Sequence, residues 1–460
     1  MDAVAALAHN VVTAFYDDLP HVTVAHTRKA ILDTLGTLLG GYNAPGCAGV
    51  VGLVREWGGT PESTIPAHGF KSTVLNAAMV NSMMARALDF DNGMDRGMHP
   101  SASSVPTAIA VAERVGRIDG KSLIAAIALG EDVAARLNFA LNKPKGFDPT
   151  GICMALGTAA TAGKLMGLGE KQLQDALGLA FNQAGGSFQS NIDGALSVRM
   201  IQGFASHSGI ISALLAQKGL TGTHNTIEGQ YGFFNLFSGD GGNASLLTEG
   251  LGRSFWGEKA VFKRYPSCGA TLGATEATLA LVAEHGIDAD NVQEISVEVS
   301  RSSYSLAGRP FEVREKPEVD AQFSLAYTIA NALVRKSSRL EHFTEEAARD
   351  EIVFDQTRKV RTMINDDLMK AGCSQSTLLR LKTKDGQHYE QLVQYPKGRP
   401  ENPLTMEELQ DKFRECVARY PDQLFARKVD RIIEMVEHLE EVTDINDLVA
   451  LLSVKEGVAC

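Results

Sequence analysis

Residues 121–137 read KSLIAAIALGEDVAARL, and this stretch indicates how most of the chain folds. Large apolar residues recur at helical spacing, so that Leu123, Ile124, Ile127 and Leu137 lie near one face of a helix. Alanines fill many of the positions between them. The pattern predicts an amphipathic helix that packs into an α-helical core.

Similar runs follow one another through the first 250 residues, separated by clusters of glycine and proline. Two of them, GTAATAGKLMGLG (157–169) and FASHSGIISALLA (204–216), carry small residues on nearly every side. Helices of this kind pack closely against several neighbours. No repeat of fixed length is visible, which favours a compact all-α core over a solenoid.

The pattern changes near residue 255. VQEISVEVS (292–300) alternates with a period of two, and residues 376–396 form two strand-like runs around Asp385 and Gly386, a hairpin signal. The chain after residue 400 is helical again, with a capping box at Thr405 and Glu408. We therefore expect a mainly α fold: a large all-α domain from residues 1–257 and 400–460, with a smaller α+β lid domain, residues 258–399, inserted in it.

Composition excludes several classes of function. The chain has 460 residues, of which 44% are hydrophobic and 22% charged, and a net charge of −11, which argues against nucleic acid or an anionic membrane as a partner. No stretch is long and apolar enough to span a membrane, and the N-terminus lacks the basic start of a signal peptide. The six cysteines are scattered without a C-x-x-C pair, so we expect a reduced, cytoplasmic protein.

The stretch ALDFDNGMDRGMHPS (87–101) concentrates polar groups between apolar neighbours. Its three aspartates match positions 1, 3 and 7 of a calcium loop, but Met94 and Pro100 replace the turn glycine and the final acid, so we expect no metal site. A solvated loop between helices is the plain alternative. Against it, both ends of the loop are anchored in apolar runs, and Ser101 can cap a helix whose free N–H groups suit a carboxylate. Asp89 and His99 could meet there as an acid–base pair.

The segments ALDFDN, HPSAS, FDPTGICMALGTAATAGKLMGLG, FKRYPSCGATLGATEA and DAQFSLAY together resemble the MmgE/PrpD family. The family includes 2-methylcitrate dehydratase, cis-aconitate decarboxylase and iminodisuccinate epimerase. The resemblance covers most of the chain. It implies a helical domain with a smaller lid domain, a homodimer, an active site between the domains, a small carboxylate substrate and no cofactor.

The resemblance also implies roles for particular residues. Asp89 and His99 match the active-site acid and histidine, with Asp89 orienting His99, and Lys263 matches a lysine at the edge of the lid. Arg199 lies in or beside a segment that supplies a substrate-binding cation, although it could be a plain helix-face residue. Lys263 and its neighbour Arg264 could likewise be surface charges. The candidate residues are catalytic His99, Asp89 and Lys263, and substrate-binding Arg199, Asp148, Ser101, Arg264 and Gly93.

The chain also departs from the family's pattern. Asp148 in GFDPTG and Leu272 in CGATLGA each stand where relatives have a histidine. Arg86 also replaces a histidine, while Gly93 and Val198 replace a threonine and a lysine of the decarboxylase branch. We expect Asp148 to be an anion that repels a tricarboxylate, and hence poor activity on cis-aconitate. These changes point to a less anionic or differently shaped substrate.

Three hypotheses follow. The first is a lyase that needs no cofactor and dehydrates a citrate-like hydroxy-polycarboxylate, with His99 as general acid/base and Lys263 and Arg199 binding its carboxylates. The second is an epimerase or isomerase of a small dicarboxylate that uses the same proton abstraction. The third is a catalytically silent scaffold protein.

Overall fold

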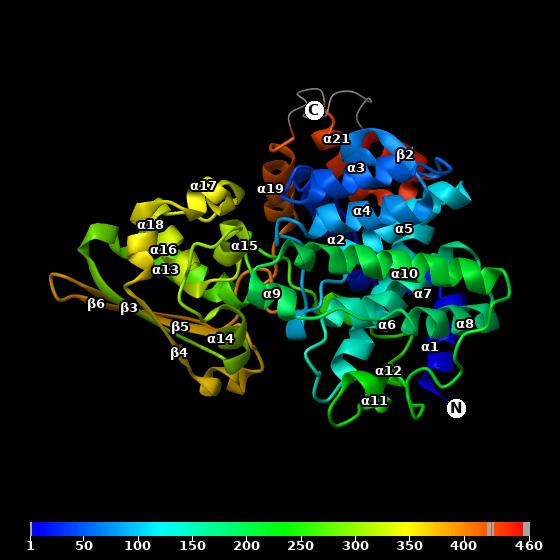
Figure 1. Ribbon diagram of the computed structural model, residues 1–460, viewed down its shortest axis with the longest axis horizontal. Helices are drawn as coiled ribbons and strands as arrows, with labels where there is room; N and C mark the ends of the chain where they lie inside the picture. The colour runs from blue at the N-terminus through cyan, green and yellow to red at the C-terminus, as the bar shows by residue number, and fades with distance from the viewer. Residues whose placement is uncertain (1, 421–424, 426, 454–460) are drawn as a thin grey trace.

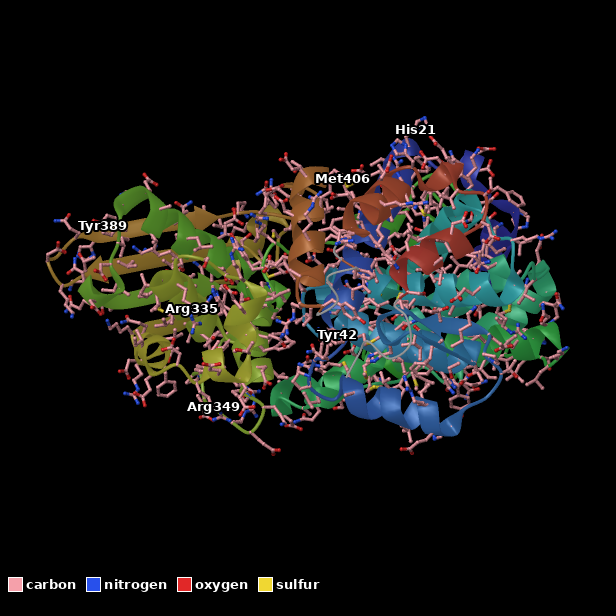
Figure 2. The ribbon with its side chains drawn as sticks, turned by 90° about the horizontal axis from the view of Figure 1, so that it is seen from above. His21, Tyr42, Arg335, Arg349, Tyr389 and Met406 are labelled. Atoms are coloured by element: carbon pink, nitrogen blue, oxygen red, sulfur yellow. The ribbon has the colours of Figure 1, made fainter. Side chains whose placement is uncertain are left out.

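The computed structural model describes residues 2–420, 425 and 427–453, and Figure 1 shows two lobes of unequal size. The larger lobe is helical and contains the N-terminal half and the C-terminal helices. The smaller one contains the main sheet. Figure 2, seen from above, places Met406 beside the junction and Tyr389 at the far end of the smaller lobe. Cys460 and the last residues of the predicted segment 400–460 lie outside the described residues.

The helical lobe starts with helices and a short hairpin. These elements are α1 Ala3–Thr13, α2 His21–Gly40, α3 Cys47–Trp57, β1 Ser63–Ile65, β2 Phe70–Ser72, α4 Val74–Arg86, α5 Ser101–Val115, α6 Gly120–Ala140, α7 Ala155–Leu165, α8 Glu170–Phe181, α9 Gln189–Asp193, α10 Met200–Gln217, α11 Phe233–Phe237 and α12 Ser245–Thr248. The C-terminal part of the chain adds α19 Met406–Val417, α21 Val429–Glu437 and α22 Asn446–Leu452.

Small residues allow these helices to pack closely, as their sequences predict. A Cβ atom added at Gly130 of α6 would lie 2.0 Å from the Thr161 hydroxyl oxygen of α7 and 2.6 Å from the Gly157 carbonyl oxygen. A Cβ added at Gly209 of α10 would lie 2.0 Å from the Thr158 hydroxyl oxygen, so α7 is held tightly between two helices. The predicted helix at residues 121–137 is the buried α6.

The smaller lobe is built around a four-stranded sheet in the order β4-β3-β5-β6. Strand β3 runs parallel to β4 and antiparallel to β5, and β5 and β6 form the predicted hairpin, with Gly386 at a φ of 86° in its turn. Its elements are α13 Leu272–His285, β3 Val292–Val299, α14 Arg301–Ala307, α15 Pro317–Gln322, α16 Leu325–Arg335, α17 Glu345–Ala348, α18 Glu351–Thr357, β4 Val360–Ile364, β5 Thr377–Thr383 and β6 His388–Val393.

Each lobe has its own apolar core. The helical core joins residues from both ends of the chain, and α19 packs against α2. Ala260 and Phe262 also pack in this core, just beyond the predicted boundary at residue 257. Two smaller cores fill the sheet-containing lobe, one between the sheet and α13 and α16, the other around Tyr327. The predicted capping box at Thr405 and Glu408 is confirmed at the start of α19.

None of the described helices is long and apolar enough to cross a membrane.

Candidate active site

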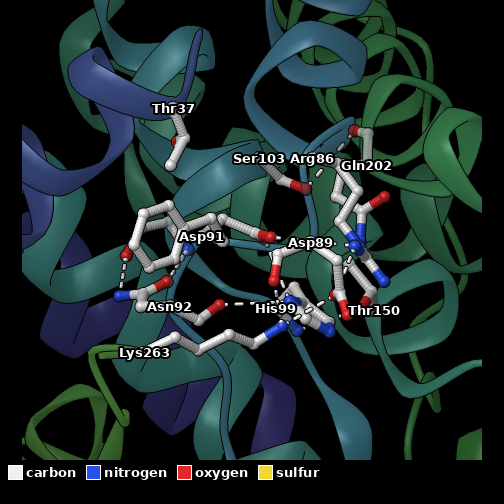
Figure 3. Close-up of polar contacts among 12 residues, drawn as sticks. Thr37, Arg86, Asp89, Asp91, Asn92, His99, Ser103, Thr150, Gln202 and Lys263 are labelled. Atoms are coloured by element: carbon white, nitrogen blue, oxygen red, sulfur yellow. Dashed lines mark hydrogen bonds and ion pairs between the residues drawn. The ribbon is translucent and has the colours of Figure 1, made fainter. Parts of the chain in front are cut away.

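The loop between α4 and α5 turns sharply at Asp89. Its φ of 48° lies in the left-handed region, which aspartate adopts more readily than most non-glycine residues. Arg86 Nη1 donates to Asp89 Oδ1 at 2.6 Å, and Lys263 Nζ donates to the same oxygen at 2.7 Å and to the Asp89 carbonyl at 2.8 Å (Figure 3). All three side chains are buried. Two cations therefore hold one carboxylate and its backbone in the turn.

Lys263 reaches the loop because the chain before it is paired with Gly93. The Gly93 N–H donates to the Val261 carbonyl at 3.0 Å, and the Val261 N–H donates back at 2.6 Å. Behind the loop, the buried ammonium of Lys412 in α19 donates to the Phe90 and Lys263 carbonyls and pairs with Asp33 of α2. Segments distant in sequence thus fix Lys263 against the loop.

His99 is paired with Asp91, not with Asp89 as the sequence analysis predicted. The distance from His99 Nδ1 to Asp91 Oδ2 is 2.9 Å, and the Asn92 carbonyl lies 3.1 Å from the same nitrogen. The turn at Asp89 directs its carboxylate to Arg86 and Lys263, which leaves Asp91, two residues later, to face His99. The His99 backbone N–H donates to the Thr150 hydroxyl at 3.0 Å, so both the ring and the main chain are held.

Charge keeps Asp91 ionised. Burial acts to raise the pKa of Asp91, but His99 and Arg86 outweigh it and hold this pKa at about 2. Burial also opposes the charge of Arg86, yet Asp89 and Asp91 raise the pKa of its guanidinium. An ionised carboxylate only accepts, so His99 Nδ1 donates to Asp91. The second ring nitrogen, Nε2, is then the basic atom of the neutral imidazole.

Arg86, His99 and Lys263 line a cavity of about 310 Å³ between the two lobes. His99, Lys263, Asp148 and Gly93 are the predicted site residues in its wall, and Arg86 lies beside them. A Cβ atom at Gly93 would lie 3.6 Å from His99 Cε1, in ordinary contact, so a larger side chain here would touch the imidazole. The cavity thus joins a base, a buried acid and two cations in one space.

The surroundings of Asp148 bear on the prediction that it is an anion. It is buried, its Oδ1 accepts the Thr150 N–H at 2.8 Å, and its N–H donates to the Gly186 carbonyl. Burial raises the pKa of Asp148, against the lowering effect of His99. Burial therefore opposes the charge on which the predicted repulsion of a tricarboxylate by Asp148 depends. A carboxyl with a raised pKa is better suited to donate a proton.

Four predicted residues lie outside the cavity wall: Asp89, whose carboxylate binds Arg86 and Lys263, and the three described next. Arg199 is buried and its Nη1 donates to the Pro45 carbonyl. Arg264 is exposed and lines a separate groove beside α19. Ser101 is buried behind the loop at the start of α5, where its hydroxyl donates to Glu131 Oε1 at 2.7 Å. Of these three, only Ser101 connects to the site, through its neighbours.

That connection includes Glu131, which the sequence analysis missed. Glu131 Oε1 accepts the hydroxyls of Ser101 and Ser104. The Asn92 amide donates to the Ser101 hydroxyl at 2.7 Å, and the carbonyl of Asn92 faces His99. Burial raises the pKa of Glu131 to about 7, although both serine hydroxyls act to lower it. A buried carboxyl under the loop therefore supports the backbone that positions His99.

Oxygen and nitrogen atoms of Asp89, Asp91 and His99 lie within 4.8 Å of one another, close enough to bind a metal ion. The charge around them is already balanced, because Arg86 and Lys263 neutralise the two carboxylates. A divalent cation would add two positive charges to this buried cluster. The donor set therefore fits an ion-pair network better than a metal site.

Comparison with known proteins gives matches along almost the whole chain. Residues 5–245 match the MmgE/PrpD N-terminal domain, and residues 265–441 match the MmgE/PrpD C-terminal domain. A cis-aconitate decarboxylase from Aspergillus terreus is 28% identical over 462 aligned positions, covering 95% of this chain and 93% of the relative. The human cis-aconitate decarboxylase is 26% identical, covering 93% of this chain and 90% of the relative.

Proposed function

This chain belongs to the MmgE/PrpD family, and on that premise we propose that it is a lyase that acts without a cofactor on a citrate-like hydroxy-polycarboxylate. The reaction would remove a proton beside a carboxylate and then expel water. The observation that supports this most directly is the His99–Asp91 pair, which faces the same cavity as Arg86 and Lys263. The decarboxylase relatives support the broader assignment as a lyase of carboxylic acids.

In the first step His99 Nε2 takes the proton from the carbon next to the carboxylate, and the C–H electron pair moves into an enolate. Asp91 stabilises the imidazolium that forms. Lys263 has three donors, of which two bind Asp89, so one is left for the developing negative charge. Arg86 binds Asp89 through Nη1, which leaves the other donors of its guanidinium for the substrate carboxylate on which the negative charge develops.

In the second step the enolate electrons form a carbon–carbon double bond while the neighbouring C–O bond breaks. The departing hydroxide needs a proton to leave as water. Asp148 lines the same cavity, and its raised pKa suits a general acid at neutral pH. The family histidine that Asp148 replaces is therefore not required for the acid step in this proposal.

Two other reactions share the first intermediate or its equivalent. Return of a proton to the opposite face of the enolate would make the protein an epimerase of a small dicarboxylate. Loss of carbon dioxide would instead give the activity named for the relatives, and the raised pKa of the buried Asp148 weakens one argument against it. A scaffold role without catalysis is disfavoured because it gives no reason to bury so many charges around a cavity.

Nuclear magnetic resonance in D₂O separates these reactions. The purified protein is incubated with citrate, 2-methylcitrate, cis-aconitate and substituted malates. Dehydration gives an alkene signal, decarboxylation of cis-aconitate gives itaconate, and epimerisation gives deuterium at the α carbon without either product. We expect the alkene. Itaconate formed at about 10 s⁻¹, a typical enzyme turnover, would instead assign decarboxylation. The absence of all three signals would refute the proposal.

We further propose that the protein forms a homodimer, on the strength of the family assignment. Light scattering coupled to gel filtration measures the mass directly. A mass of one chain at micromolar concentration would contradict it.

A further inference from the structure

The cavity wall opposite the His99 loop is uncharged. Within the described chain, the lining residues between positions 268 and 375 include serines, Gln375 and apolar side chains, and none of them carries a charge. The charged groups come from the loop, from Arg86 at the end of α4, from Asp148 and from Lys263. A carboxylate that points toward this wall would therefore meet no cation.

Three half-buried apolar side chains face the cavity, two from this wall and Phe188 from beside it. Phe188 precedes α9 in the helical lobe, Leu306 lies in α14, and Phe323 follows α15. Phe188 packs against the loop, because a Cβ atom on Gly97 would lie only 2.8 Å from its ring. Side chains from both lobes thus present apolar surface to the same space.

The cations around the cavity can balance few carboxylates of a substrate. Arg86, Lys263 and Arg96 line it, but Arg86 and Lys263 already bind Asp89, and Arg96 Nη1 donates to two backbone carbonyls. Asp95, which also lines the cavity, pairs with Arg399. These four cations are equal in number to the four acidic side chains Asp89, Asp91, Asp95 and Asp148. A tricarboxylate would leave the site strongly negative.

A second cavity continues past the apolar wall. It measures about 320 Å³ and shares Asn191, Leu306 and Phe323 with the first. A substituent longer than a methyl group therefore has space along Leu306 and Phe323. Beyond these shared side chains its lining also includes Arg309, Glu312, Arg314 and Asp320, of which Arg314 and Asp320 pair with each other.

From these observations we propose that the substrate is a dicarboxylate with an alkyl or aryl group in place of citrate's third carboxylate arm, that is, a 2-substituted malate. The inference rests on the proposed function, which supplies the reacting hydroxy acid. One carboxylate binds Arg86 and Lys263 beside His99. The apolar group lies between Phe188, Leu306 and Phe323 and determines specificity.

Binding of unreactive analogues tests this independently of turnover. Dissociation constants of succinate, 2-methylsuccinate, 2-butylsuccinate and citrate are measured by isothermal titration calorimetry on the intact protein. Each buried methylene should tighten binding up to about fourfold, so 2-butylsuccinate should bind best. Citrate binding tighter than 2-butylsuccinate, or no gain with chain length, would overturn the proposal.

A pair of variants locates the effect. Phe188→Ala should weaken 2-butylsuccinate at least fivefold while changing succinate less than twofold. Phe15→Ala removes the same side chain at a position 62% exposed and remote from the cavity, and should change neither ligand. Equal weakening of both ligands by Phe188→Ala, or none, would contradict the assigned wall.

The two proposals fail in different ways. Alkyl-dependent binding with no α-carbon deuterium exchange on any hydroxy acid would refute the proposed function and leave the binding preference established. Exchange or dehydration of citrate that exceeds that of every 2-substituted malate would support the lyase and overturn this inference.

Discussion

The loop from Ala87 to Pro100 and the wall formed by residues 268–375 face the same cavity but hold their side chains differently. On the loop, most polar groups are fixed by ion pairs and hydrogen bonds, and Asp89 and Arg96 both adopt left-handed backbone conformations. On the wall, apolar side chains pack against the core of the smaller lobe. The difference suggests that one side carries out the chemistry and the other selects the ligand.

Replacing Asp91 should produce the largest effect on this division. Asp91→Asn removes the charge that stabilises the His99 imidazolium and fixes its tautomer. We expect kcat to fall by about 10²–10⁴ with little change in KM. Steady-state kinetics on the best hydroxy acid measures this. Asp17→Asn, at an exposed position, is the matched control, and equal kinetics in the two variants would remove Asp91 from the mechanism.

Replacing Lys263 should have a smaller effect on turnover and a larger one on binding. Lys263→Met keeps the length of the side chain but loses a carboxylate ligand, so KM should rise about 10–100-fold. It also leaves Asp89 paired with Arg86 alone, which should lower the free energy of unfolding by about 3 kcal/mol. Lys370→Met, an exposed substitution, controls for the lost charge. A fall in kcat at unchanged KM would make Lys263 a proton-transfer residue.

The smallest effect on turnover is expected from replacing Glu131, which is buried behind the loop. Burial raises the pKa of Glu131 to about 7, from 4.5 for an ordinary glutamate. Between these values the unfolded chain loses the proton that the folded chain keeps, so wild-type stability falls as pH rises from 4.5 to 7 and is level above pH 7. Glu131→Gln removes this pH-dependent loss. The free energy of unfolding of the variant minus that of wild type should therefore be larger at pH 8 than at pH 4.5, by up to about 3 kcal/mol.

Urea denaturation at the two pH values measures the difference, and the exposed Glu351→Gln controls for the lost charge. The glutamine can still accept both serine hydroxyls, so activity should remain. An equal stability difference at both pH values would show that Glu131 is not protonated in the folded chain.

Periodicity alone was enough to predict the main architecture. Apolar residues at helical spacing predicted α6, and alternating apolar residues predicted β3 and the β5–β6 hairpin. The two patterns differ because helices and strands bury side chains at different intervals. The contacts that pack these elements against one another could not be derived in the same way. Contacts such as Lys412 with the Phe90 carbonyl join positions far apart in sequence, and no local pattern indicates them.

The sequence indicated part of the cavity lining, namely His99, Lys263, Asp148 and Gly93, but not how the charged groups pair. The loop contains three aspartates, and the backbone turn at Asp89 determines which of them faces His99. Burial raises the pKa of Asp148, and burial cannot be read from one sequence. In the sequence pattern Asp91 is a candidate only for a calcium ligand. Its position two residues after Asp89 is the signal that could have indicated a partner for His99.

The central claim, that His99 removes a proton beside a carboxylate, is tested most directly by deuterium exchange. Wild type and His99→Ala are incubated with the hydroxy acids above in D₂O, and deuterium at the α carbon is followed by nuclear magnetic resonance. His99→Asn, which keeps a polar side chain in the loop, and circular dichroism show whether the variants stay folded. We predict exchange by wild type and a loss of about 10²–10⁴ in its rate in both folded variants. Exchange at the wild-type rate in folded His99→Ala would contradict the claim.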